Sequence, residues 1–350
     1  MSETVIGRAS LRDVPVYAPD ASECAVDLRD NINLWGTPPR ALEAVRDAAP
    51  SALSLYPAVA GGRLTRTLAT RIGVNSEEIA AGCGSDDLID AVFRAVAEPG
   101  AVVAHPAPSF SMVPIFARLN GLVPRAVPLR RDGCADADAM LATNARIIYV
   151  CSPNNPTGTA TPADVVRRVV RESNAIVVLD GAYAEFDPDA EDLLREAPAL
   201  ERLLVLRTFS KAWGLAGLRV GYAVGGRELI RAVRQSSGPY KVNALAELAA
   251  SVAVEEDAAW MRAQADEAVR CRDRLSDALR QLGLNPLDSR GNFVAVPVPD
   301  ARRVATRLAE RGFAVRAFVG LPVYGDLIRV GVAPWPTLES LVQAWREVLA

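Results

Sequence analysis

One stretch, residues 207–222, constrains the fold more than any other part of the chain. It places Lys211 in a glycine-rich loop between two apolar runs, 203–206 and 220–224, which predict buried strands. Because burial disfavours a charged ammonium, it lowers the pKa of a lysine and makes the amine a nucleophile toward carbonyl groups. Three further side chains of the stretch suit a phosphate: Thr208, Ser210 and Arg219. The plainer alternative is two strands joined by a loop with a surface lysine.

Length and composition favour a globular chain with more than one core. At 350 residues, half of them hydrophobic and 23% charged, the chain is long for a single compact core, so a large and a small domain are expected. The net charge of −3 and the lack of a basic block argue against nucleic acid as a partner. Neither a membrane span nor the apolar core of a signal peptide is evident, so a cytoplasmic location is expected.

The cysteines and the single histidine exclude several kinds of chemistry. Five scattered cysteines without a CxxC pair fit a reducing compartment. No His/Cys cluster is present, so no metal site is expected. A Ser-His-Asp hydrolase would need His105, the sole histidine, as its base, and its position at a strand end disfavours that role.

Predicted strands alternate with predicted helices, which favours an α/β fold with helices on both faces of a sheet. Buried strands are predicted at 101–104, 147–150, 175–179, 203–206 and 220–224, and helices at 39–48, 63–72, 226–237 and 243–282. Beyond residue 284 the pattern changes to short strands at 292–297, 314–319 and 327–332, with helices at 300–311 and 337–349. We therefore expect an N-terminal arm over 1–35, a large domain over 36–265 and a small α/β domain over 266–350.

Polar residues follow several of the predicted strands. Asp180 ends the run 175–179, where a carboxylate is costly unless it is paired. A rigid turn with two Asn and two Pro, residues 151–159, follows the strand 147–150. A helix begins near Ser85, and its free N–H groups suit a phosphate. Open α/β sheets bind ligands at the edge where their strands end. Taken one at a time, however, these segments are also explained by turn formation and helix capping.

Two motifs together carry a resemblance to a known family. The stretch Ser-Lys-Ala-Trp-Gly-Leu-Ala-Gly-Leu-Arg-Val-Gly (210–221) and the turn Asn-Asn-Pro-Thr-Gly (154–158) resemble fold-type I enzymes dependent on pyridoxal phosphate (PLP). The chain is most similar to the histidinol-phosphate aminotransferase group, with matches from Tyr17 to Arg329 in family order. The resemblance implies an aspartate-aminotransferase-like fold with a mostly parallel seven-stranded sheet. It also implies PLP as cofactor and a homodimer with shared active sites.

The resemblance implies catalytic roles around the cofactor ring. Lys211 would bind PLP covalently and transfer a proton as general base and acid. Asp180 would keep the pyridine nitrogen protonated, so that the ring can accept electrons. Asn155 and Tyr183 would bond the ring oxygen, and Asn155 would also border the substrate. Phe110 stands where the family usually places a tyrosine that stacks on the ring.

Further residues are implied at the two ends of the site. Seven residues would bind the cofactor phosphate, the last of them from the partner subunit: Gly84, Ser85, Asp86, Thr208, Ser210, Arg219 and Tyr56. Arg329 would bind the substrate anion, with Tyr17 closing over it from the partner chain. Arg316 could assist, but an ion pair at the surface or at an interface is the favoured interpretation of that residue.

The sequence departs from the family pattern at Ile32, Leu34, Phe110 and Gly181. Histidinol phosphate with 2-oxoglutarate, a reaction of histidine biosynthesis, is the first choice of substrates. The alternatives are an aromatic or secondary-pathway amino-acid aminotransferase and a threonine-phosphate decarboxylase-like enzyme. A regulator that binds PLP without catalysis would need a DNA-binding module, and no basic helical segment precedes residue 30.

Overall fold

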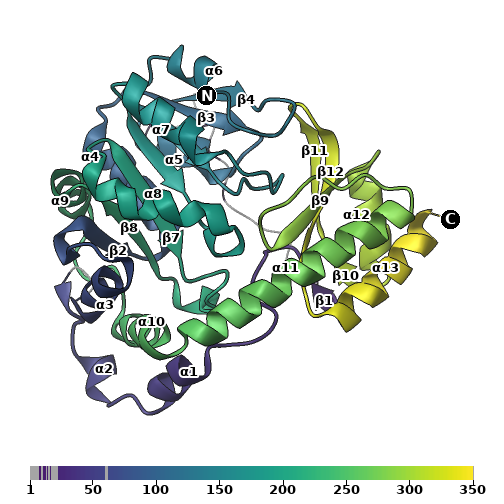
Figure 1. Ribbon diagram of the computed structural model, residues 1–350, viewed down its shortest axis with the longest axis horizontal. Helices are drawn as coiled ribbons and strands as arrows, with labels where there is room; N and C mark the ends of the chain where they lie inside the picture. The colour runs from purple at the N-terminus through teal and green to yellow at the C-terminus, as the bar shows by residue number, and fades with distance from the viewer. Residues whose placement is uncertain are drawn as a thin grey trace, which may run out of the picture.

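A seven-stranded sheet forms the centre of the larger part of the molecule (Figure 1). The computed structural model of the protein describes residues 8, 11, 12, 14, 16, 23–59 and 62–349. β8 is antiparallel to both of its neighbours, and the other neighbouring strands are parallel. The strand order is β2 (Ile79–Gly82), β8 (Gly221–Gly225), β7 (Leu203–Thr208), β6 (Ile176–Asp180), β5 (Ile147–Cys151), β3 (Val102–Ala107), β4 (Val123–Pro128). The predicted α/β class and mostly parallel sheet are confirmed.

Helices cover both faces of this sheet. Alternate side chains along its strands point to opposite faces and enter two separate apolar cores, so both faces must be shielded from water. On β7, Leu203 and Val205 belong to one core, whereas Leu204 and Leu206 belong to the other. The first core includes side chains from α1 (Pro39–Arg46), α3 (Gly62–Ile72), α6 (Ala137–Leu141), α7 (Ala163–Glu172), α8 (Glu191–Glu196) and α10 (Ala244–Glu256). The second includes side chains from α4 (Gly84–Val96), α5 (Met112–Leu119) and α9 (Arg227–Ser236). The short α2 (Ser51–Ser54) buries no side chain.

The prediction of one helix over 243–282 is wrong, because the chain breaks at Asp257 into α10 and α11 (Ala258–Gln281). The buried Asp257 carboxylate accepts hydrogen bonds from the backbone N–H groups of Arg40 at 3.2 Å and Ala41 at 2.9 Å. These N–H groups open α1 and have no partner within that helix. A tertiary contact therefore interrupts a segment whose local pattern is continuously helical.

The smaller part of the molecule contains an antiparallel sheet of order β11 (Arg316–Leu321), β12 (Gly325–Gly331), β9 (Phe293–Pro297). α12 (Ala301–Ala309) and α13 (Trp335–Leu349) pack with this sheet around a separate apolar core. α11 runs between the two parts (Figure 1): Met261 and Ala265 lie in a core of the large sheet, Leu275 and Leu279 in the small core. The domain boundary at 265/266 falls inside this helix and stays a prediction.

An N-terminal segment also crosses between the two parts. β1 (Val26–Asp27) pairs in parallel with β10 (Phe313–Ala314), so the residues after it are held against the small core. Within the described part of the chain, no helix has the length and apolarity needed to span a bilayer. Over the same residues, no three His, Cys, Asp or Glu side chains gather into a possible metal site.

Candidate active site

A cavity of about 550 Å³ opens where β5, β6 and β7 end and the small sheet faces them. Ligand sites are expected at this carboxyl edge of parallel strands. The cavity is lined by Asp30, Ser85, Asp86, Ser109, Phe110, Ser111, Met112, Cys151, Asn155, Asp180, Ala182, Tyr183, Thr208, Ser210, Lys211, Arg219, Arg316, Phe318 and Arg329. Most of the residues singled out from the sequence therefore lie around one space, although they come from segments far apart in the chain.

Lys211 follows β7 and projects its amine into the cavity. Its Nζ donates a hydrogen bond to the carbonyl oxygen of Asp30 at 2.7 Å and lies 5.7 Å from the centre of the Tyr183 ring. Burial, together with the positive charge of Arg329, lowers the pKa of Lys211 to about 8. Far more of this amine is unprotonated at neutral pH than for a solvated lysine, which suits nucleophilic and proton-transfer chemistry.

Asp180 ends β6 and is only 3% exposed. Its Oδ1 accepts a hydrogen bond from the Ala182 N–H at 3.0 Å, and its Oδ2 accepts one from the Tyr149 hydroxyl at 2.6 Å. Burial raises the pKa of Asp180 to about 6, although the Tyr149 bond acts in the opposite direction. A cationic N–H partner beside such a buried carboxylate would stabilise its charged form.

Tyr149 was missed in the sequence, where it belongs to the apolar run 147–150. The side chain is fully buried within β5, and burial raises the pKa of its hydroxyl well above the ordinary value. A tyrosine in the middle of a buried strand needs a hydrogen-bond partner, and that requirement is the only signal that the sequence offered.

One end of the cavity is shaped for a phosphate. Ser85 and Asp86 open α4 at a turn where Gly84 has a φ of 80°. A Cβ at Gly84 would stand 2.8 Å from Nη2 of Arg219, so glycine lets the guanidinium approach the helix start. Arg219 Nη1 donates to Ser210 Oγ at 3.3 Å, and Nη2 lies 3.5 Å from Asp86 Oδ2. Helix N–H groups, hydroxyls and a guanidinium are the donors that phosphate binding requires.

The opposite end of the cavity carries two arginines from the small sheet. Arg329 Nη1 donates to Asn155 Oδ1 at 2.5 Å, and its guanidinium lies 5.6 Å from the ring centres of Phe293 and Phe318. Arg316 Nη2 forms an ion pair with Asp30 Oδ1 at 2.9 Å.

Residues 28–31 form a strap across this end, and it contacts the site through its backbone. Four successive backbone carbonyl groups of the strap each accept a hydrogen bond. The carbonyl oxygen of Leu28 accepts from the Gly331 N–H at 2.8 Å, and that of Arg29 accepts from the Arg329 guanidinium. The carbonyl oxygen of Asp30 accepts from Lys211 Nζ at 2.7 Å, and that of Asn31 accepts from Asn292 Nδ2 at 2.9 Å. Asn31 adds a bond from Nδ2 to the Tyr183 hydroxyl at 3.2 Å. Backbone carbonyl groups leave no trace in a residue pattern, so only the structure reveals the strap.

Two aromatic residues, Tyr17 and Tyr56, are expected to reach the site from the partner chain. Tyr17 lies outside the described residues. Tyr56 is described and is absent from the cavity wall; it is 82% exposed and stacks on Tyr240 with ring centres 4.6 Å apart.

Gly181 has a steric explanation. A Cβ at this position would stand 1.6 Å from Nη1 of Arg207, which is buried and donates to the Gly181 carbonyl at 3.2 Å. The guanidinium of Arg207 therefore fills the space that any side chain at position 181 would need.

The groups around the cavity fit PLP. The glycine turn and Arg219 form an anion cradle at one end, the buried Asp180 carboxylate suits a protonated ring nitrogen, and the Lys211 amine lies between the two ends. A seven-stranded α/β fold with these groups at its carboxyl edge defines a PLP-dependent enzyme. Residues 24–344 match the family model described as aminotransferase class I and II, and the chain belongs to this family.

Relatives carry two names. The chain is 36% identical over 351 residues to the aromatic amino acid aminotransferase of Corynebacterium glutamicum, covering 98% of this chain and 99% of that one. It is 37% identical over 342 residues to histidinol-phosphate aminotransferase 2 of Pseudomonas aeruginosa, covering 93% and 89%.

Solved structures show the same fold. The histidinol-phosphate aminotransferase of Sinorhizobium meliloti, solved with PLP, superposes with a TM-score of 0.90 at 27% identity and covers 99% of this chain and 98% of its own. The aspartate aminotransferase of Thermus thermophilus with maleate gives a TM-score of 0.81 at 26% identity, covering 93% and 92%. The expected aspartate-aminotransferase-like fold, the PLP dependence and the aminotransferase activity are thereby confirmed.

Proposed function

We propose that this aminotransferase takes its amino group from a donor with an aromatic or imidazole ring and passes it to a 2-oxo acid such as 2-oxoglutarate. The observation that carries the proposal is the position of the Lys211 amine in one cavity with the Asp180 carboxylate and the Arg329 guanidinium. Phe110, Met112 and Phe318 add an apolar wall on which a ring can pack.

Each residue then has a task that its surroundings support. PLP, when bound, supplies an electron sink for the carbanion left by removal of the α-proton. Lys211 Nζ, with its lowered pKa, takes that proton and returns it as general base and acid. Asp180 holds the ring nitrogen protonated, and Asn155 and Tyr183 bond the ring oxygen.

The two ends of the cavity hold anions. Six residues bind the cofactor phosphate: Gly84, Ser85, Asp86, Thr208, Ser210 and Arg219. Arg329 binds the anionic group of the donor and the carboxylate of the acceptor.

Two donors fit this description. Aromatic L-amino acids present one carboxylate to Arg329, and the C. glutamicum relative is named for that class. Histidinol phosphate presents a phosphate instead. The likeness to the S. meliloti structure favours this donor. So does the register that sets Arg316 opposite Arg329 across β11 and β12, because it brings a second guanidinium to the same end of the cavity. A decarboxylase acting on a threonine phosphate would release CO₂ and form no glutamate.

A panel of donors tests the proposal. Purified protein loaded with PLP is given 2-oxoglutarate with L-phenylalanine, L-tyrosine, L-tryptophan or histidinol phosphate, and glutamate formation is measured. Formation of glutamate from at least one of the four is expected. Release of CO₂ without glutamate, or inactivity with all four donors, would contradict the proposal.

Two copies of the chain are expected to form the active unit. Four apolar or aromatic side chains over 53–59 are 67–82% exposed in one chain: Leu53, Leu55, Tyr56 and Val59. An exposed patch of this kind marks an interaction surface, and a two-fold dimer is the common assembly. Tyr56 would then reach the cofactor phosphate of the partner subunit. Sedimentation should give about twice the 37.3 kDa of the chain, and a fully active monomer would refute this expectation.

Tyr149→Phe is expected to lower turnover without loss of fold. The bond from its hydroxyl lowers the pKa of Asp180, so its removal raises that pKa further above about 6 and leaves less carboxylate at pH 6 than at pH 8. A hydrogen bond to a charged group contributes roughly 1.5–3 kcal/mol, so turnover should fall by about tenfold or more, most at low pH. The pH dependence of the bound cofactor's absorbance should shift with it. An unchanged pH profile would assign Tyr149 a packing role only.

A further inference from the structure

We propose that Asp30 selects the anion of the substrate, favouring a singly charged carboxylate over a phosphate. The inference rests on the proposed function and deepens it, because it chooses between the two donors. Under this proposal the enzyme prefers aromatic amino acids to histidinol phosphate.

Asp30 lines the cavity together with Arg316, Arg329 and Phe318, and its carboxylate pairs with Arg316. Its Oδ1 lies 2.9 Å from Nη2 of Arg316; the side chain of Arg316 is 26% exposed and that of Asp30 is 62% exposed. Arg316 and Arg329 face each other across β11 and β12, so Asp30 engages one of two neighbouring guanidinium groups.

The backbone holds Asp30 in this position. Its own carbonyl oxygen accepts the bond from Lys211 Nζ, while the carbonyl groups of its neighbours Arg29 and Asn31 are bound by Arg329 and Asn292. Asn31 has a φ of 52° and is buried, so the strap bends sharply just after Asp30. The backbone from which the Asp30 side chain projects is therefore held by hydrogen bonds on both sides, and the ion pair with Arg316 directs the carboxylate.

Charge then discriminates between the two kinds of donor. A phosphate monoester carries between about −1.5 and −2 at neutral pH and gains most from two guanidinium groups. Asp30 already balances the charge of Arg316 and adds a negative charge beside any second anion. A carboxylate needs a single bidentate guanidinium and carries one charge, so Asp30 costs it less.

Binding of two inhibitors to the PLP-loaded enzyme tests the charge filter without turnover. 3-Phenylpropanoate and 2-phenylethylphosphonate share the ring and linker and differ in the anion. In Asp30→Asn, which keeps the size of the side chain and removes its charge, calorimetry should show phosphonate affinity at least about tenfold higher, with carboxylate affinity changed less than about threefold. The ratio of kcat/KM for histidinol phosphate to that for L-phenylalanine should rise by a similar factor.

Arg316→Gln provides the opposite change, because it leaves the Asp30 charge unbalanced. The phosphonate should then bind at least about tenfold more weakly relative to the carboxylate, and Asp30→Asn in that background should restore the loss. Glu43→Gln is the matched control: it removes a carboxylate 2.8 Å from Arg40 on α1, outside the cavity wall, and should leave both affinities unchanged.

The outcomes separate the inference from the proposed function. If the affinity ratio is the same in wild type, Asp30→Asn and Arg316→Gln, the charge filter is refuted even when all donors are transaminated. If the wild type uses none of the donors, the proposed function fails, whereas the binding ratios still decide on Asp30. Should Asp30→Asn fail to fold, the Arg316→Gln ratio alone decides.

Discussion

Replacing Lys211 with alanine is expected to abolish amino transfer and to leave PLP removable by dialysis. Under the proposed function the Lys211 amine binds the cofactor covalently and moves the α-proton, and its pKa of about 8 suits both tasks. Loss of a general base alone costs between about 10²- and 10⁴-fold in rate, and loss of the covalent attachment adds to it. Turnover and the absorbance retained after dialysis measure the two effects.

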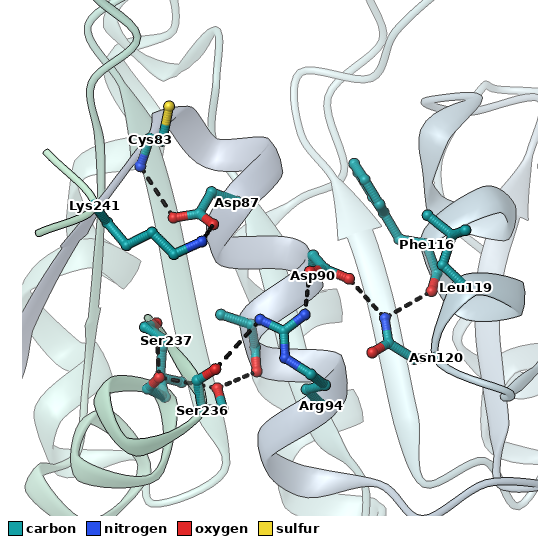
Figure 2. A network of polar contacts seen from close by, with 12 residues as sticks. Cys83, Asp87, Asp90, Arg94, Phe116, Leu119, Asn120, Ser236, Ser237 and Lys241 are labelled. Atoms are coloured by element: carbon teal, nitrogen blue, oxygen red, sulfur yellow. Dashed lines mark hydrogen bonds and ion pairs between the residues drawn. The ribbon is translucent and has the colours of Figure 1, made fainter. Parts of the chain in front are cut away.

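The chain provides an internal control, because Lys241 is its only other lysine. Figure 2 shows Lys241 turned toward α4, where its Nζ lies 2.7 Å from Oδ1 of Asp87. The same carboxylate accepts a bond from the Cys83 N–H, which fixes it at the start of the helix. Lys241→Arg preserves the ion pair and should leave activity and cofactor retention unchanged. After borohydride reduction, peptide mapping should find the pyridoxyl group on Lys211; a label on Lys241 would overturn the assignment.

Much of the fold follows from local pattern. The strands β5, β6, β7 and β8 are apolar on both faces, so their sequences indicate a sheet covered on both sides, and the structure places them side by side. The double-Asn turn follows β5, the lysine stretch lies between β7 and β8, and the glycine turn at 84 follows β2. Their convergence at one edge could be predicted from the rule for parallel sheets.

The remaining parts of the site depend on contacts that no local pattern contains. The bond from Tyr149 to Asp180 joins two neighbouring strands, and its signal is hidden in an apolar run. The pairing of Asp30 with Arg316 spans 286 positions, and the strap is held through backbone oxygens. Likewise, Asp257 interrupts a helical pattern because it caps a helix more than 200 residues earlier. Motifs therefore predict residues at the end of the cavity around Arg219, whereas pairs of residues far apart in the chain build the end around Arg329.

Asp180→Asn is expected to change activity and stability in opposite directions. The folded pKa of about 6 lies above the ordinary value of 3.8, because burial disfavours the carboxylate. A group with a raised folded pKa contributes stability that is fully present below its unfolded pKa and is lost as pH rises through the folded value. The cofactor-free wild type should therefore lose on the order of 3 kcal/mol between about pH 4 and pH 6–7 relative to a neutral side chain.

Asparagine cannot ionise, so it removes the free-energy cost of burying the Asp180 carboxylate at neutral pH. Its amide oxygen can still accept the Ala182 N–H, and the Tyr149 hydroxyl can accept from the amide nitrogen, so the contacts of the strand end persist. Without cofactor, the mutant should melt higher than wild type at pH 7 and at nearly the same temperature at pH 4. A mutant that melts lower than wild type at pH 7 would show that the carboxylate is stabilised by its surroundings rather than strained by burial.

Turnover of the same mutant should fall by about 10²- to 10³-fold, the scale for removing one fixed charge that stabilises a transition state. The neutral amide could not hold the ring nitrogen of bound PLP in its protonated form, which would weaken the electron sink that the cofactor supplies under the proposed function. The cofactor should still be retained, because the phosphate cradle around Arg219 is unchanged. Near-native turnover would reject Asp180 as the partner of the ring nitrogen. A large loss of turnover in a mutant that melts higher than wild type would show that the loss is due to the chemistry and not to unfolding. The buried Asp180 carboxylate destabilises the cofactor-free enzyme. Its presence is then explained by the bound cofactor, whose protonated ring nitrogen supplies the opposite charge.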